Sequence, residues 1–209
     1  MSKHSTAKSN IERRSDRGRP RGFDIHGVAV SAADVFWKHG YHATSIETLC
    51  NATGLMRGSL YGAFGDKQGL LVAAFDSYAQ GAVAALKERL DAKLPPRQAL
   101  REALLHYTRV AAKLTGRHGC FITNATLELL PGDDALRPHI EGTLKQIAAL
   151  LAAAVVRGQA TGTFDACLDE QAVGHFLLCI VQGLRVLGKV SLDEKELVSI
   201  VDMAMRVLG

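Results

Sequence analysis

The sequence lacks the patterns that mark most enzymes and metalloproteins. We find no carboxylate pair set for acid–base catalysis, no nucleophile elbow, no phosphate-binding glycine loop and no cluster of metal ligands. The cysteines Cys50, Cys120, Cys167 and Cys179 are far apart and form no CxxC pair, a pattern typical of free thiols in a reducing compartment. These absences predict a non-enzymatic protein without a cofactor or a metal.

Long apolar runs are also missing. No run reaches the roughly 18 residues expected of a membrane span. The polar, basic N-terminus has no apolar segment of the kind found in secretory signals. We therefore expect a cytoplasmic protein that does not enter a membrane.

Proline is scarce, with only five in 209 residues, whereas apolar residues make up 47% of the chain. Apolar side chains recur at helical spacing, and neither strand alternation nor an internal repeat is present. This pattern predicts an all-α fold. The expected helices are 25–39, 45–53, 56–64, 67–90, 97–115, 120–130, 134–157 (or from Pro138), 169–189 and 193–208.

Positive charge is concentrated in the first 22 residues. They hold seven Lys and Arg against two acids, a balance of +5, while the whole chain carries only +4, so the remainder sums to −1. We interpret residues 1–22 as a disordered basic arm in which Arg19 and Arg21 contact DNA phosphates or the minor groove. The alternative is a solubilising tail without a ligand.

Residues 44–67 have the pattern of a helix-turn-helix followed by the start of another helix. Thr44 precedes Glu47 by three residues, the spacing of a capping box, and Gly54 ends the first short helix. The second short helix leaves a polar, partly basic face free to enter a major groove. Arg57 is its only long cationic donor and is the candidate for a bidentate guanine contact, with Met56 against a thymine methyl. The predicted DNA-binding residues are Arg19, Arg21, Thr44, Ser45, Met56, Arg57, Gly58, Ser59, Tyr61 and Lys67.

Three segments together resemble a known family. They are Gly-Arg-Pro-Arg (18–21), Val-Phe-Trp-Lys-His-Gly-Tyr-His-Ala-Thr-Ser-Ile (35–46) and Ala-Thr-Gly-Leu-Met-Arg-Gly-Ser-Leu-Tyr-Gly-Ala-Phe-Gly-Asp-Lys (52–67). This pattern resembles the N-terminal domain of TetR/AcrR-type transcriptional regulators. The resemblance implies a helix-turn-helix domain over 23–66 and a helical effector-binding and dimerisation domain over 67–209. It also implies a homodimer on a palindromic DNA operator, with Thr44, Tyr61 and Lys67 at phosphates, and release by a small-molecule or thiol-reactive effector.

The run Gly119-Cys120-x-x-x-Asn124-x-x-x-Glu128 resembles one found in some regulators of that family, a few of which sense electrophiles with a cysteine. Cys120 lies near a predicted helix N-terminus and next to cationic residues, and both features favour a thiolate. The alternative is a small buried core residue. Asn124 and Glu128 share a helix face, either as a polar network that closes an effector pocket or simply as caps and solvated positions. The effector candidates are Cys120, Phe75, Tyr78, Tyr107, Phe121, Asn124 and Glu128.

The last two predicted helices carry apolar faces, and the family resemblance implies that they pair with a second subunit. The dimerisation candidates are Phe176, Ile180, Leu184, Leu187, Ile200, Val201 and Met205. His175 and Cys179 are four residues apart on one helix but lack further ligands, so we expect no metal there. The competing functions are a small helical enzyme and an architectural DNA-binding protein without an effector site. A ligand cavity, or operator release by a small molecule, distinguishes a regulator from both.

Overall fold

The computed structural model describes residues 22–113, 118–190 and 193–209, and within these ranges the chain is helical without a strand. The predicted basic arm with Arg19 and Arg21 therefore lies outside the described residues. The elements are α1 (Ile25–His39), α2 (Ile46–Thr53), α3 (Arg57–Phe64), α4 (Lys67–Leu90), α5 (Pro96–Ala111), α6 (Phe121–Leu129), α7 (Arg137–Ala160), α8 (Glu170–Leu187), the 3-10 turn η2 (Gly188–Val190) and α9 (Glu194–Arg206).

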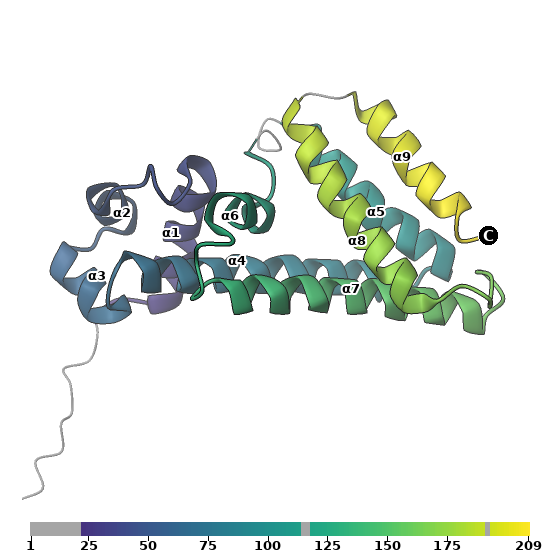
Figure 1. Cartoon of the computed structure of the whole chain (residues 1–209), viewed down its shortest axis with the longest axis horizontal. Coiled ribbons are helices and arrows are strands. Elements are labelled where there is room, and N and C mark those ends of the chain that lie inside the picture. Colours follow the sequence, from purple (N-terminus) through teal and green to yellow (C-terminus); the bar gives the residue numbers. More distant parts are fainter. Residues whose placement is uncertain (1–21, 114–117, 191–192) are drawn as a thin grey trace, which may run out of the picture.

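The molecule is elongated. Figure 1 shows α1 to α3 at one end, α4 and α7 side by side along the length, and α5, α8 and α9 at the other end. Helix α6 lies between the two ends and contacts both α1 and α4. The all-α architecture, with a small N-terminal module and a larger helical part, confirms the predicted fold class.

Helices α1 to α3 enclose a small core. The Asp24 carboxylate accepts from the backbone N–H groups of His26 and Gly27 and caps α1. Phe36, Leu49 and Leu60 are buried. Gly54 ends α2 in the left-handed region (φ 69°), so the chain reverses between α2 and α3 as a helix-turn-helix requires.

The predicted capping box at Thr44 is wrong. Ser45 is the N-cap of α2, and its hydroxyl accepts from the Thr48 N–H at 3.0 Å. Thr44 is instead buried, and its hydroxyl donates to the Gly40 carbonyl at 2.6 Å. Its N–H donates to the Tyr41 carbonyl. Both donors of Thr44 are used inside the protein, which leaves neither of them for the predicted phosphate contact.

The larger part of the chain begins and ends its helices close to the predicted positions. Asp66, Asp169 and Asp193 cap α4, α8 and α9, and Asp193 forms a full capping box with Glu196. Pro96 lies in the first turn of α5, where a missing N–H costs nothing. Helix α7 begins at Arg137, one residue before Pro138, and Asp133 accepts from the Leu136 N–H just ahead of it.

The segment 147–156 of α7 is apolar nearly all round, but the single chain does not bury it on every side. Leu151 and Val155 are buried against neighbouring helices, but Ala149, Ala153 and Val156 are exposed. Helices α4, α5 and α8 cover one side of α7, and the opposite side stays open.

The sequence has no long unbroken apolar run, but three helices of the described ranges are apolar enough to cross a membrane by length and composition alone. They are Lys67–Leu90, Arg137–Ala160 and Glu170–Val190. In the structure they pack against one another and bury Leu71, Leu151 and Leu177 completely. Their apolar character therefore supplies the core of the larger domain.

Candidate nucleic-acid interface and ligand cavity

The outer face of α3 presents the residues predicted to bind DNA. Leu60 points into the core, which turns Arg57, Gly58 and Ser59 to solvent. Met56 is the N-cap residue and is 83% exposed, so the helix begins one residue later than predicted. The Arg57 guanidinium lies over the Tyr61 ring, 5.2 Å from its centroid, and donates to the Tyr61 hydroxyl at 3.3 Å. The stacked ring limits the conformations of Arg57, which favours a defined contact.

Lys67 lies at the start of α4 behind this face. Its ammonium donates to the Tyr41 carbonyl at 2.6 Å and lies 4.2 Å from the centre of the Tyr41 ring. Partial burial lowers the pKa of Lys67. A phosphate contact by Lys67 stays a prediction, and it requires one of the two remaining ammonium protons.

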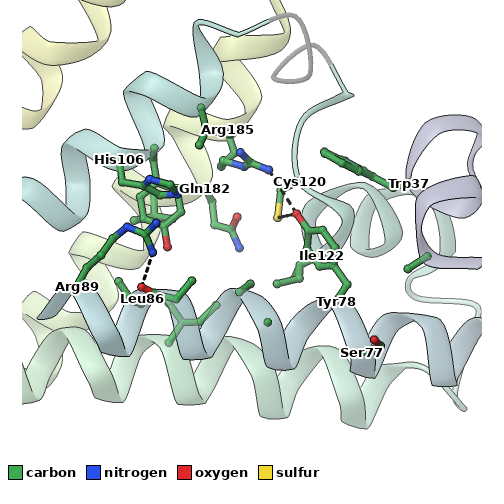
Figure 2. Close-up of a pocket in the computed structure, with 18 of the residues that line it drawn as sticks. Trp37, Ser77, Tyr78, Leu86, Arg89, His106, Cys120, Ile122, Gln182 and Arg185 are labelled. Atoms are coloured by element: carbon green, nitrogen blue, oxygen red, sulfur yellow. Dashed lines mark hydrogen bonds between the residues drawn. The ribbon is translucent and has the colours of Figure 1, made fainter. Parts of the chain in front are cut away.

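A cavity of about 510 Å³, here called the central cavity, lies between the two parts of the chain. Figure 2 shows Arg185, Cys120 and Tyr78 together near Trp37, with Arg89 and His106 farther along the cavity. Most of the wall is apolar. The lining residues come from α1, α4, α5, the start of α6, α7 and α8, and include Trp37, Tyr78, Leu86, Tyr107, Val110, Cys120, Ile122, Val181, Gln182 and Arg185.

Cys120 is the N-cap residue of α6 and is 8% exposed. Its thiol faces the central cavity, with the Tyr78 hydroxyl 4.0 Å from the sulfur. Burial raises the pKa of Tyr78 above its ordinary value, so this phenol is neutral and can donate. The structure thus brings three predicted effector residues, Tyr78, Tyr107 and Cys120, to one cavity wall.

Phe75 and Phe121 do not line the cavity, and their prediction as effector residues is wrong. Both are buried, and their ring centroids lie 6.0 Å apart. Phe121 also contacts the Tyr78 ring edge-on at 5.5 Å. The two rings support the cavity wall from behind because α4 and α6 pack there.

Asn124 and Glu128 lie outside the central cavity, so they do not close it as a polar network. The Asn124 amide donates to the His118 carbonyl at 2.8 Å and accepts from Lys189. The Glu128 carboxylate accepts from the N–H groups of Tyr41 and His42 at 3.0 and 2.8 Å. Neither residue caps a helix. The Glu128 carboxylate instead holds the loop between α1 and α2, and this contact links the helix-turn-helix to α6.

We predict that Glu128→Ala speeds hydrogen exchange at the amides of Tyr41 and His42, because both lose their acceptor. The carboxylate is exposed, so the expected protection lost is modest, about 1 kcal/mol or roughly fivefold in rate. Hydrogen–deuterium exchange resolved by NMR measures it. Glu128→Gln keeps one neutral acceptor and should give an intermediate rate. Unchanged exchange at both amides in the alanine variant would contradict the role assigned to Glu128.

Sequence reasoning missed Trp37, His106, Gln182 and Arg185 as cavity residues. The signal for Arg185 was present, because it is the one Lys or Arg of its helix and lies between Leu184 and Val186. Burial and the nearby charges of Arg89 and Arg109 lower the pKa of His106 to about 4, so its ring is neutral at pH 7.

The dimerisation candidates divide into two groups. Leu184, Val201 and Met205 are buried within the single chain and cannot face a partner, so these three predictions are wrong. Periodicity finds an apolar face but does not say which neighbour covers it. Leu187 is exposed, and Phe176, Ile180 and Ile200 are partly so. Further apolar residues exposed at this end of the molecule are Val186, Val190, Met203 and Val207.

His175 and Cys179 are exposed on α8, and the His175 ring contacts the Gln171 carbonyl. In the described ranges no group of three or more His, Cys, Asp or Glu residues could hold a metal ion.

Comparison with known proteins assigns both parts of the chain. Residues 30–74 match the family model described as bacterial regulatory proteins, tetR family. Residues 96–203 match the model described as tetracyclin repressor-like, C-terminal domain.

Two curated bacterial relatives span nearly the whole chain. The HTH-type transcriptional regulator YezE of Bacillus subtilis is 30% identical over 192 residues, which cover 91% of this chain and 99% of that protein. The HTH-type transcriptional repressor ComR of Escherichia coli is 30% identical over 202 residues, 93% of each chain. Among solved structures, a cysteine mutant of the TetR family regulator CifR in complex with 26-base-pair operator DNA is 28% identical. It has a TM-score of 0.80 and covers 92% of this chain and 100% of its own.

Proposed function

Because the chain belongs to the tetR family of bacterial regulatory proteins and is a DNA-binding transcriptional regulator, we propose that an effector in the central cavity releases its homodimer from a palindromic operator. One observation carries the proposal, namely that the cavity wall joins Trp37 of α1 to Tyr78 of α4 and Cys120 of α6. An occupant therefore touches the DNA-binding module and the larger domain at once. A volume of about 510 Å³ suits a small organic molecule.

The DNA-binding roles proposed for α3 follow from its exposed face. Arg57 donates to a guanine in the major groove, and Met56 contacts a thymine methyl. The hydroxyls of Ser45, Ser59 and Tyr61 bind phosphates and fix the position of the helix. The CifR–operator complex supports this orientation because its fold matches over most of the chain.

The proposed domain division is a basic arm over 1–22, a helix-turn-helix domain over 23–66 and an effector-binding and dimerisation domain over 67–209. Helix α4 joins the two folded parts without a flexible linker, and Leu70 and Leu71 in its first turn are buried. A change in the direction of α4 therefore moves the helix-turn-helix with it. We place the protein in the cytoplasm, in keeping with its family, and propose no catalytic activity.

The experiment begins with genome-wide mapping of the DNA that the protein binds. The operator found in this way is titrated with the full-length homodimer, with and without compounds that the neighbouring genes suggest. Trp37 is the only tryptophan in the chain and lines the cavity, so its fluorescence reports occupancy. We expect compounds that change Trp37 emission also to weaken operator binding. A compound that occupies the cavity but leaves operator affinity unchanged would contradict the proposal.

For a thiol-reactive effector, we predict that Cys120 reacts with a quinone or an aldehyde faster than Cys167 does. Cys167 is exposed and Cys120 is 8% exposed, so access alone favours Cys167. Cys120 lies at the N-terminus of α6 and its sulfur faces the central cavity, where a small apolar electrophile would be held beside it, and this placement would reverse the order. Mass spectrometry of briefly treated protein measures both rates. If Cys120 reacts no faster than Cys167, the cysteine is a packing residue and the effector binds without a covalent bond.

A further inference from the structure

Arg185 is a buried cation at the wall of the central cavity. Only 7% of the residue is exposed, yet no carboxylate in the described ranges lies within ion-pair distance of it. One guanidinium nitrogen donates to the Gly119 carbonyl at 2.6 Å and to the Tyr78 hydroxyl at 3.4 Å. Buried charges in proteins are normally paired, because leaving water costs several kcal/mol per ion. Two neutral acceptors compensate only part of that cost, so the site favours an added anion.

The rest of the wall strengthens this preference. Arg89 and His106 line the same cavity, and the positive surroundings contribute to keeping His106 uncharged. Asp34 is the one carboxylate among the described lining residues, and it pairs with Lys38 at 2.5 Å on the surface of α1. The cavity thus carries two arginines against one acid that is already paired. In a partly dehydrated site such an excess attracts negative charge more strongly than it would in water.

We propose that the effector is a small organic anion, an apolar body with one carboxylate or similar group, and that Arg185 binds its charge. The inference rests on the effector function proposed above and specifies its ligand class. Figure 2 shows the guanidinium of Arg185 at the cavity beside Cys120. Its remaining N–H groups match the two oxygens of a carboxylate. Ala82, Leu86, Val110 and Val181 form an apolar wall for the body of the ligand.

Binding of an anion by Arg185 would also affect the DNA-binding module. The Gly119 carbonyl accepts from Arg185 and from the indole N–H of Trp37, at 2.6 and 3.3 Å. An anion that draws Arg185 away from this carbonyl changes a contact that α1 shares. The same side chain would therefore recognise the ligand and report its presence to α1.

Two matched fluorescent probes test the ligand class on the full-length protein. Anilinonaphthalene sulfonate and N-phenylnaphthylamine have the same aromatic body, but only the first carries an anionic group. Binding is scored by quenching of Trp37 emission. We expect the sulfonate to bind at least roughly tenfold more tightly, because a charged hydrogen bond replaces an unpaired buried cation. Arg185→Gln should remove this preference and leave the neutral probe unaffected.

Arg89→Gln is the matched control, because it removes the other arginine of the cavity and should preserve most of the preference. If Arg185→Gln fails to fold, the ratio of the two probe affinities is compared between the wild type and Arg185→Lys. The lysine variant is expected to prefer the sulfonate less strongly than the wild type does. Equal affinities of the two probes in the wild type, or a preference lost with Arg89 instead of Arg185, overturn the inference and leave the effector function standing. If neither probe quenches Trp37, no apolar aromatic body enters the cavity and the inferred ligand class is overturned, while the operator titration still decides the effector function.

Discussion

Replacing Arg57 with alanine is expected to weaken operator binding by the homodimer by about 2–6 kcal/mol, because each of its two recognition helices loses a contact worth about 1–3 kcal/mol. Arg57 is exposed on α3 and held against the Tyr61 ring, so it reaches the groove with part of its conformational entropy already lost. The variant should also tolerate a changed base at the position that Arg57 contacts. Titration of the mapped operator and of single-base variants measures both effects.

Two further variants make the result specific. Arg109→Ala removes an exposed arginine of α5, far from α3, and should leave operator affinity within the error of the titration. Arg57→Lys keeps the positive charge but loses the planar guanidinium. Compared with the alanine variant, it should therefore regain part of the affinity for DNA of any sequence but little of the preference for one base. If the alanine variant keeps the wild-type affinity and base preference, Arg57 does not contact a base of the operator.

Phe75→Ala is expected to cost about 3–5 kcal/mol of the free energy of unfolding, the usual cost of deleting a buried aromatic ring. Phe75 is 0% exposed in α4 and contacts the Phe121 ring of α6. Chemical denaturation of the dimer at a fixed protein concentration measures the loss. If Phe75 instead lined the ligand site, its truncation would cost little stability and mainly alter ligand affinity.

Leu127→Ala is a suitable comparison. Leu127 belongs to α6, as Phe121 does, but it is 75% exposed. Its removal should change the free energy of unfolding by no more than about 0.5 kcal/mol. A similar cost for the two variants would mean that Phe75 does not have the core role described here.

Local signals predicted most of the fold. Asp24, Asp66, Asp169 and Asp193 cap helices through bonds to backbone groups within three residues, and such short-range patterns are visible in a sequence. The error at Thr44 arose because Thr44 and the adjacent Ser45 have the same capping chemistry. Burial decided between them, since Thr44 packs inside and uses its hydroxyl on Gly40.

The cavity could not be predicted in the same way, because it is formed by contacts between residues far apart in the sequence. Glu128 meets Tyr41 and His42 across more than 80 residues, and Arg185 meets Gly119 across 66. The motif containing Cys120, Asn124 and Glu128 was therefore found in the sequence, but the partners of its last two residues were not. The aromatic residues show the same limit. Tyr78 and Phe75 are three residues apart on α4, yet only Tyr78 reaches the cavity.

Helix α6 is short enough to act as a rigid lever. Its nine residues span roughly 13 Å, with Cys120 at the cavity end and Glu128 near the end that holds the loop before α2. A tilt of about 10° about the cavity end would move the far end by about 2 Å over this length. That displacement is enough to break both bonds from the Glu128 carboxylate, which are 3.0 and 2.8 Å long. A ligand that tilts this one short helix would thus release the loop before α2 from α6, while α4 still joins the helix-turn-helix to the larger domain.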